Sequence, residues 1–271
     1  MLISAPHFNK LLGQHFLTCE WVLPALAKAA ELARTDTVLE IGPGTGVLTR
    51  FLAQRAKRII AVEKDATLST LLSATLAKEK ITNVAIVTDD ILSLFQTKSG
   101  MGAWLSQKKY KVVANIPYYL TSRLIRILLE QERRPEIIVL MIQREVAERA
   151  VAQPPDMNML ALSVQTYGTP EIIADVPASC FHPRPKVDSA ILKISGISED
   201  FFTERHIAPK DFFALAKAGF SSRRKILSNN LRDFASKKEL FRALVSLGHS
   251  PTARAQELSL EKWTALIRML S

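Results

Sequence analysis

Val38-Leu-Glu-Ile-Gly42-Pro-Gly44-Thr-Gly46 is the stretch that decides the fold, because an apolar run ends there in a glycine-rich turn. The run predicts a buried strand, and the residues from Val47 to Ala56 predict a helix directly after the turn. Glycines let a backbone bend tightly and let a ligand come close. The spacing is G-x-G-x-G, and Val47 occupies the place of the last glycine of the dinucleotide motif G-x-G-x-x-G. We therefore expect a ligand at this turn, but the spacing lowers the odds for NAD or FAD.

Apolar runs and helical stretches alternate on the C-terminal side of this turn. This alternation predicts parallel βαβ units and an open sheet that is covered on both faces. The predicted strands are 58–63, 84–87, 111–114 and 136–142, and the predicted helices are 67–80 and 122–130. Such sheets bind ligands at the carboxyl ends of their strands. Gly42, Glu63, Asp90 and Asn115 all fall at those ends.

The pattern changes after about Ala150. A region punctuated by prolines ends in a predicted late strand at 189–194, and beyond Asp200 the apolar spacing becomes helical. We expect two domains. The first, 1–199, contains the α/β sheet, and the second, 200–271, is small and all-helical.

The chain has 271 residues and a net charge of +10. From Asp200 to Ser271 there are 13 Lys and Arg against 7 Asp and Glu, so this quarter carries more than half of the excess. Such an excess gives modest support for a surface that faces nucleic acid. No apolar stretch reaches the length of a membrane span, and no secretory signal is apparent. We therefore expect a cytoplasmic protein.

Neither the cysteines nor the histidines have the spacing of metal ligands. The five histidines are scattered, which disfavours a metal site. Cys19 and Cys180 lie far apart in the chain, and we expect them to be two ordinary thiols in a reducing cytosol.

Asn115-Ile-Pro-Tyr118 follows a predicted buried strand and combines groups that suit a site better than a core. The Asn115 side chain offers a carbonyl oxygen that accepts hydrogen bonds. Pro117 fixes its own φ and restricts Ile116, so the backbone carbonyls hold set directions. Tyr118 offers a flat face for stacking. Together they suit an exocyclic amine and the ring that bears it, although a turn after a strand is an alternative.

Two acidic positions strengthen the prediction of a nucleotide-like pocket. Glu63 stands 21 residues after Gly42, where a carboxylate can accept both hydroxyls of a ribose. Asp90 can accept from an adenine amino group, but its neighbour Asp89 competes for that role, and spacing alone does not choose between them.

Several motifs resemble, in family order and over nearly the whole chain, those of the ribosomal RNA adenine N6,N6-dimethyltransferases, a group of S-adenosylmethionine-dependent methyltransferases. They are Gly13-Gln-His-Phe-Leu17, Glu40 to Gly46, Asp90-Ile-Leu92, Asn115-Ile-Pro-Tyr118, Gln143-Arg-Glu-Val-Ala-Glu-Arg149, Phe181-His-Pro-Arg-Pro-Lys-Val-Asp-Ser189 and Phe220 to Leu231. The resemblance implies a Rossmann-like class I methyltransferase sheet with S-adenosyl-L-methionine as cofactor.

The resemblance also implies roles for individual residues. His15 stands where many members carry Asn, so its backbone contact is the one expected to remain. Phe181 is expected to stack on the target base opposite Tyr118, and a core aromatic is the alternative for Phe181. The implied cofactor contacts are His15, Leu17, Gly42, Gly44, Glu63, Asp90 and Asn115.

The implied reaction is methyl transfer to the N6 amine of adenine. The oxygen of Asn115 and the backbone carbonyl of Pro117 are expected to accept the two amine hydrogens and aim the lone pair, because such alignment supplies much of the effective molarity of a site. The target base must leave its stack or come from a loop.

The implied substrate is a pair of adjacent adenines in the 3′-terminal hairpin of 16S ribosomal RNA, methylated in the 30S subunit or its precursor by a monomeric enzyme during subunit biogenesis. Arg223, Arg224 and Lys225 form a basic cluster on a predicted helix, which we expect to contact phosphates, although a solvated helix face is the usual reading of such a run. Two other functions stay open: a resistance methyltransferase that acts on large-subunit RNA, and a non-catalytic factor that keeps this fold. The basic helical tail and Tyr118 to Ser122 favour the small subunit over the first, and intact Asn115 and Tyr118 argue against the second.

Overall fold

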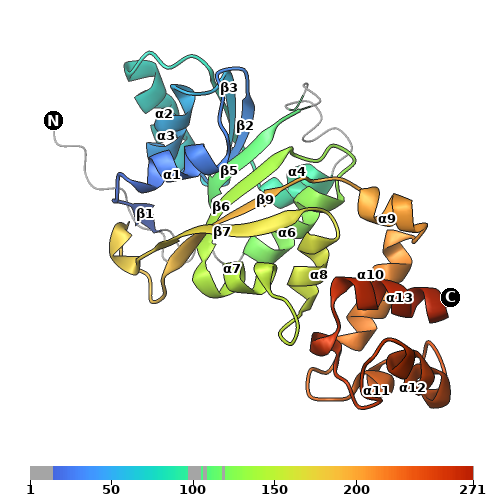
Figure 1. The fold of residues 1–271 in the computed structure, drawn as a ribbon. Coiled ribbons are helices and arrows are strands. Elements are labelled where there is room, and N and C mark those ends of the chain that lie inside the picture. The colour runs from blue at the N-terminus through green and yellow to red at the C-terminus, as the bar shows by residue number, and fades with distance from the viewer. Residues whose placement is uncertain (1–14, 97–104, 106–108, 118–119, 271) are drawn as a thin grey trace. The chain divides into compact units, whose positions relative to one another are not determined.

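The computed structural model describes residues 15–96, 105, 109–117 and 120–270, and contains a seven-stranded sheet between layers of helices (Figure 1). The strands follow the order β4-β3-β2-β5-β6-β9-β7. They are β2 (Thr37–Ile41), β3 (Arg58–Glu63), β4 (Val84–Thr88), β5 (Lys111–Asn115), β6 (Ile137–Gln143), β7 (Thr169–Val176) and β9 (Ser189–Ser195). The predicted mixed α/β class is confirmed.

The neighbours from β4 to β6 pair in parallel, so their carboxyl ends share one edge of the sheet. β9 runs antiparallel to β6, with Ser189 opposite Gln143 and Ile194 opposite Ile138. The amino end of β9 therefore lies at the edge where the parallel strands end. This places the proline-punctuated region before β9 beside the residues that follow the parallel strands.

Helices cover the sheet because its strands are apolar on both faces. The helices of this part are α1 (Val22–Ala29), α2 (Val47–Ala53), α3 (Ala66–Lys78), α4 (Ile91–Gln96) and α6 (Thr121–Glu130). One core cluster joins Leu26 of α1 and Leu52 of α2 to Val38, Val113 and Val139 of the sheet. The side chain of Asp65 caps α3 by accepting from the amides of Thr67 and Leu68, as an acidic N-cap does. The helices α2, α3 and α6 were predicted, whereas α1 and α4 were not.

A short second sheet contradicts the prediction for the cysteines. β1 (Phe16–Leu17) pairs antiparallel with β8 (Phe181–His182). The pairing brings the Cα atoms of Cys19 and Cys180 to 4.9 Å, and the two residues form a disulfide. The prediction of two separate thiols was wrong, because a sequence separation of 161 says nothing about the pairing of these two strands.

The chain divides into two compact units. The first contains the described parts of 1–147 and 171–197, and the second contains 148–170 and the described part of 198–271. The predicted boundary between a first domain, 1–199, and a second domain, 200–271, stays a prediction. The helices of the second unit are α8 (Met159–Gln165), α9 (Asp200–Arg205), α10 (Pro209–Gly219), α11 (Leu227–Asn230), α12 (Lys237–Ser246) and α13 (Leu260–Leu270), and α7 (Arg144–Val151) spans the division.

Aromatic side chains fill much of the core of the second unit. Phe202, Phe212 and Trp263 are buried, and the ring of Phe220 stacks on Trp263 with centroids 5.5 Å apart. Leu240 and Leu244 of α12 are buried as their helical spacing predicted. In the part of the chain that the structure describes, no helix is both long and apolar enough to cross a membrane.

Candidate active site

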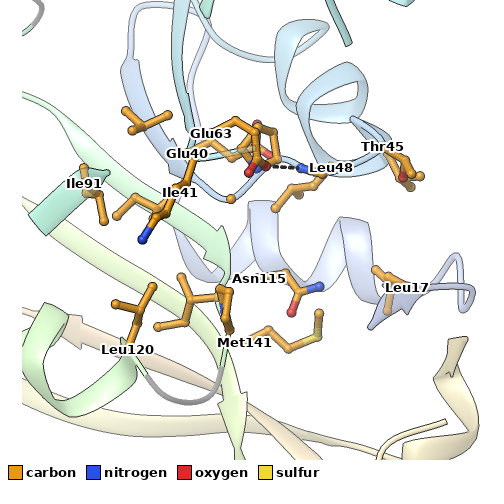
Figure 2. Close-up of a pocket in the computed structure, with 18 of the residues that line it drawn as sticks. Leu17, Glu40, Ile41, Thr45, Leu48, Glu63, Ile91, Asn115, Leu120 and Met141 are labelled. Carbon is orange, nitrogen blue, oxygen red and sulfur yellow. Dashed lines mark hydrogen bonds between the residues drawn. The ribbon is translucent and has the colours of Figure 1, made fainter. Parts of the chain in front are cut away.

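A cavity opens at the carboxyl ends of β2, β3, β4 and β5, inside the first unit (Figure 2). Its wall is built from β1 (Phe16–Leu17), β2, β3, β5, β6, α1, α2, α4 and the turns that flank the strands, since parallel strands end at a common edge. Predicted site residues that line it are His15, Leu17, Gly42, Gly44, Glu63, Asp89, Asp90, Asn115 and Pro117. The sheet therefore brings together the positions that the sequence singled out at the strand ends.

The glycine turn after β2 needs its glycines for conformation. Gly42, Gly44 and Gly46 have φ values of 68°, 56° and 78°, which L side chains rarely adopt. A Cβ on Gly42 would lie 3.7 Å from Cδ of Pro117 and 3.9 Å from the backbone oxygen of Asn115. The turn thus passes close to the Asn115–Pro117 segment, and a side chain at Gly42 would both strain the turn and narrow the cavity.

Glu63 is buried at the end of β3, and backbone amides hold both of its oxygens. Gly44 donates to Oε2 at 3.0 Å, and Asp65 donates to Oε1 at 2.9 Å. A carboxylate oxygen accepts more than one hydrogen bond, so each oxygen keeps a lone pair for a ligand. The arrangement fixes an acceptor pair in the cavity wall, as recognition of vicinal hydroxyls requires.

Glu40 lies beside Glu63 in the same wall (Figure 2) and was missed as a site residue. It is 1% exposed, and among the described residues its Oε2 has no hydrogen-bond partner. Burial raises the pKa of Glu40 to about 8; the nearby Thr49 hydroxyl acts against this shift and the charge of Glu63 adds to it. At neutral pH the side chain is therefore largely a neutral carboxylic acid.

Asp90 and Asp89 follow β4 and both line the cavity. Asp90 accepts from the Leu92 amide at 2.9 Å and from the Lys64 ammonium at 3.0 Å. Burial alone would raise the pKa of Asp90, but those two donors and Arg123 lower it below its ordinary value. Asp89 is exposed and accepts from the Asp90 amide at 2.6 Å. Asp90 is thus the better ordered carboxylate, and it stays charged at neutral pH.

Asn115 is the last residue of β5 and points its amide into the cavity, next to Met141 on β6 (Figure 2). Its Nδ2 lies 3.5 Å from the backbone carbonyl of His15. Since the nitrogen faces that carbonyl, the side-chain oxygen is left for other donors. The Pro117 carbonyl accepts from the Leu120 amide at 3.1 Å and keeps its second lone pair.

Two of the expected base-contacting residues are not part of this wall as the structure describes it. Phe181 is 4% exposed and packs in the core cluster with Val176 and Ile191, which matches the alternative of a core aromatic. Tyr118 lies outside the described residues, as does the Gly13-Gln14 part of the N-terminal motif. Of that motif, His15 and Leu17 line the cavity.

The apolar part of the wall was not predicted. Ile91, Leu120, Met141 and Leu48 line the cavity, as Figure 2 shows. Ile91 and Leu120 follow Asp90 and the Asn115–Tyr118 motif closely, so their position in the chain was a usable signal. Met141 is found only through the register, in which it stands opposite Asn115. Apolar side chains of this kind suit the faces of a flat ring.

Arg223, Arg224 and Lys225 are exposed, but the prediction that they lie on a helix was wrong. They form the turn between α10 and α11. The Asn230 side chain holds this turn by donating to the carbonyls of Gly219 at 2.6 Å and Ser222 at 3.0 Å. The three cations therefore belong to an exposed turn and do not form a charged helix face.

Carboxylates outnumber cations in the cavity wall, with Glu63 and Asp90 held ready to accept hydrogen bonds. Such a set of acidic acceptors fits a positively charged nucleoside better than an anionic one. Within the described ranges, no group of three His, Cys, Asp or Glu side chains is placed to hold a metal ion.

Comparison with known proteins matches residues 5–271 to the family of ribosomal RNA adenine dimethylases. One similar relative is the ribosomal RNA small subunit methyltransferase A of Dehalococcoides mccartyi (strain ATCC BAA-2266 / KCTC 15142 / 195). It is 44% identical over 261 residues, covering 95% of this chain and 87% of that protein.

Two solved structures share the fold over nearly the whole chain. A dimethyladenosine transferase from Plasmodium falciparum superposes with a TM-score of 0.76 and 27% identity, covering 93% of this chain and 96% of the other. The 23S rRNA methyltransferase ErmE superposes with a TM-score of 0.73 and 25% identity, covering 94% and 99%.

Proposed function

The chain belongs to the ribosomal RNA adenine dimethylase family, and from that premise we propose that it dimethylates N6 of two adjacent adenines in the 3′-terminal hairpin of 16S ribosomal RNA, with S-adenosyl-L-methionine as methyl donor. The observation that carries this proposal is the meeting of the glycine turn, Glu63 and Asn115 in one cavity. The full-length family match supports the same conclusion.

Similarity favours the small ribosomal subunit over the large one. The relative with 44% identity is named for the small subunit, whereas the 23S enzyme is 25% identical. Both classes share the fold, so the choice rests on this difference and on the basic turn of the second unit. We propose that the protein acts on the 30S subunit or its precursor as a cytoplasmic monomer, during subunit biogenesis.

For the cofactor, we propose contacts along the sheet edge. The Glu63 carboxylate accepts from the ribose hydroxyls, and its two amide donors fix it for that purpose. Asp90 accepts from the adenine amine in preference to Asp89, because Leu92 and Lys64 orient its carboxylate. His15 and Leu17 cover the ligand, and the bare backbone of Gly42 and Gly44 lets the methionine part approach. When bound, the cofactor supplies an electrophilic methyl group on a cationic sulfur.

For the target, we propose that Asn115 and Pro117 hold the amine. The Asn115 oxygen accepts one hydrogen and the Pro117 carbonyl accepts the other, which turns the nitrogen lone pair toward the cavity. These contacts strengthen as the nitrogen becomes tetrahedral, so they favour the transition state over the bound substrate. No strong base is needed, since the amine proton becomes acidic as the methyl group transfers.

We assign base capture and RNA binding to further residues. We propose that Tyr118 and Phe181 stack on the target base, which requires Phe181 to leave the core position in which it is 4% exposed. The turn formed by Arg223, Arg224 and Lys225 contacts phosphates of the RNA. Three exposed cations on one turn can follow a curved RNA backbone.

The test uses ribosomal particles from cells that lack their own enzyme of this family. The purified protein is incubated with the methyl donor and with 30S particles, 50S particles, free 16S RNA or free 23S RNA. Primer extension then locates dimethyladenine, which blocks reverse transcription. We expect stops at two adjacent adenines near the 3′ end of 16S RNA and none in 23S RNA.

Modification of 23S RNA alone would overturn the choice of subunit. Binding of RNA without any methyl transfer would instead support a non-catalytic factor. The cofactor assignment is tested separately, by calorimetry with S-adenosylhomocysteine and with NAD. Binding of NAD alone would contradict the assignment of S-adenosyl-L-methionine as cofactor.

A further inference from the structure

A covalent bridge lies next to the aromatic residue that we propose stacks on the target base. Cys180 directly precedes Phe181, and it is bonded to Cys19 across 161 residues. The chain contains two cysteines, so neither has another intramolecular partner. The bridge therefore joins the N-terminal segment that contributes Leu17 to the cavity with the segment that carries Phe181.

Hydrogen bonds on both sides of the bridge hold the same two segments together. Leu17 pairs with Phe181 in the short sheet, and the Thr18 amide donates to the Cys180 carbonyl at 2.8 Å. At the other end, Nδ1 of His15 lies 2.7 Å from the Pro183 carbonyl and must be the donor, because a carbonyl only accepts. β8 is thus fixed to β1 at each end, and the disulfide is the covalent part of this attachment.

Phe181 is in a position that does not suit stacking. Its side chain is 4% exposed and belongs to the core cluster that also contains Cys180 and Ile191. A base can stack on a ring only when one face of the ring is open. For Phe181 to present a face, its segment must move away from the core cluster, and the bridge at the adjacent residue ties that segment to β1 and resists the movement.

This inference rests on the proposed function. We propose that Cys19 and Cys180 are positioning residues that act through Phe181: the disulfide keeps its ring in the core, and reduction of the bridge releases β8 so that the ring reaches the target base. In the reducing step, two glutathione thiols give up two electrons and two protons. The S–S bond breaks, an S–H bond forms on each cysteine, and the reductant leaves as its own disulfide.

The exposure of Cys19 and the redox environment of a cytosol both agree with regulation by reduction of the bridge. Cys180 is buried, whereas Cys19 is half-buried, so an attacking thiolate reaches the sulfur of Cys19. Disulfides in a reducing cytosol are usually transient or redox-sensing, and a permanent structural bridge is uncommon there. On this proposal the oxidised chain is the inactive form and the reduced chain is the active form.

The experiment compares wild-type protein equilibrated in oxidising and reducing glutathione buffers, each with the Cys19→Ser/Cys180→Ser double variant as control. Alkylation under denaturing conditions followed by mass measurement counts the free thiols. We expect no adduct on the oxidised protein and two on the reduced one. Reduction should lower the KM for 30S particles by about tenfold, the scale of one base–aromatic stack. The affinity for S-adenosylhomocysteine should stay unchanged.

A second readout does not depend on methyl transfer. Hydrogen exchange at the Thr18 amide, which donates to Cys180, should speed up on reduction in the wild type. In the double variant, exchange and KM should match those of the reduced wild type in both buffers. A plain loss of structure would raise exchange throughout the chain, whereas the proposed release is confined to β1 and β8.

Three results would overturn the proposal: two free thiols in the oxidising buffer, equal KM values for RNA in the two states, or a lower KM in the bridged state. Absence of methyl transfer in both states would instead count against the proposed function. The exchange measurement would still decide whether the bridge controls β8.

Discussion

The side-chain amide nitrogen of Asn115 lies 3.5 Å from the backbone carbonyl of His15, 100 residues earlier in the chain. This hydrogen bond orients the amide, so that its oxygen faces the cavity and its nitrogen faces the N-terminal segment. An acceptor with a fixed direction is what alignment of a target amine requires.

The first prediction follows from this orientation. Asn115→Ala should lower the single-turnover rate of methyl transfer by about 10²–10³, the loss found for one positioned polar group at comparable sites. RNA affinity and melting temperature should change little, because the side chain lines a cavity and fills no part of the core. The rate is measured at saturating RNA. If a well-folded variant had nearly normal turnover, the Asn115–Tyr118 motif would be only a structural turn.

The second prediction concerns Glu63. Glu63→Ala should weaken binding of S-adenosylhomocysteine by roughly 1.5–3 kcal/mol for each ribose hydrogen bond that it removes, as measured by calorimetry. The matched control is Glu79→Ala. Glu79 is an exposed acid paired with Arg50 and does not line the cavity, so its removal changes the net charge equally. Equal weakening in the two variants would mean that overall charge, and no specific hydrogen bond, causes the effect.

The third prediction uses the raised pKa of Glu40. Between its ordinary value of 4.5 and about 8, the folded chain holds a proton on Glu40 that the unfolded chain releases. The native state thus binds more protons over this window, and stability must fall as pH rises through it. In Glu40→Gln this loss should vanish. The difference in unfolding free energy, wild type minus variant, should therefore decline by about 1.4 kcal/mol per pH unit.

Urea unfolding at a series of pH values between 5 and 8 measures this difference. Other titrating groups, including the histidines, are common to both proteins and cancel in the subtraction. Asp90 acts in the opposite sense, because its lowered pKa removes stability only as the medium becomes more acidic than this window. Parallel stability curves for the two proteins would contradict a neutral Glu40.

The fourth prediction concerns the basic turn. Changing Arg223, Arg224 and Lys225 to Ala should weaken RNA binding and make its salt dependence shallower. The slope of log affinity against log salt should fall by about one for each phosphate that is no longer neutralised. Cofactor binding should be unaffected. The control changes Lys237, Lys238 and Arg242, three exposed cations of α12, to Ala. If both triple variants reduce the slope equally, the turn is an ordinary solvated surface.

The central sheet and its acidic positions were predictable because local patterns determine them. A buried parallel strand needs an unbroken apolar run, and such runs marked β2, β3, β5 and β6 directly. The edge strand β7 was missed because only its last residue is buried, so Thr169–Val176 lacks that signal. The helix α1 was also missed. It contains Pro24 in its first turn, where proline is tolerated although it usually breaks helices.

Features that depend on the meeting of distant segments were not readable from the sequence. The disulfide required the pairing of β1 with β8. The burial of Phe181 required a core cluster that residues from many parts of the chain form together. The ion pair between Lys64 and Asp90 joins the ends of two predicted strands, but neither their order in the sheet nor their side-chain distances could be read from the sequence. The sequence analysis predicted that the basic cluster lies on a helix. A run of charged residues does not reveal that the Asn230 side chain closes a turn there by hydrogen bonding.

The antiparallel direction of β9 has a consequence for how such enzymes can diversify. Because β9 starts at the edge where β2 to β5 end, the segment from Pro177 to Asp188 brings the chain back to that edge of the sheet without taking part in the parallel sheet. That segment is tied by the Cys19–Cys180 disulfide and by the pairing of β8 with β1 to the N-terminal segment that contributes His15 and Leu17 to the cavity wall. A change in the length of one segment must therefore be matched in the other, so the two segments can diverge only together.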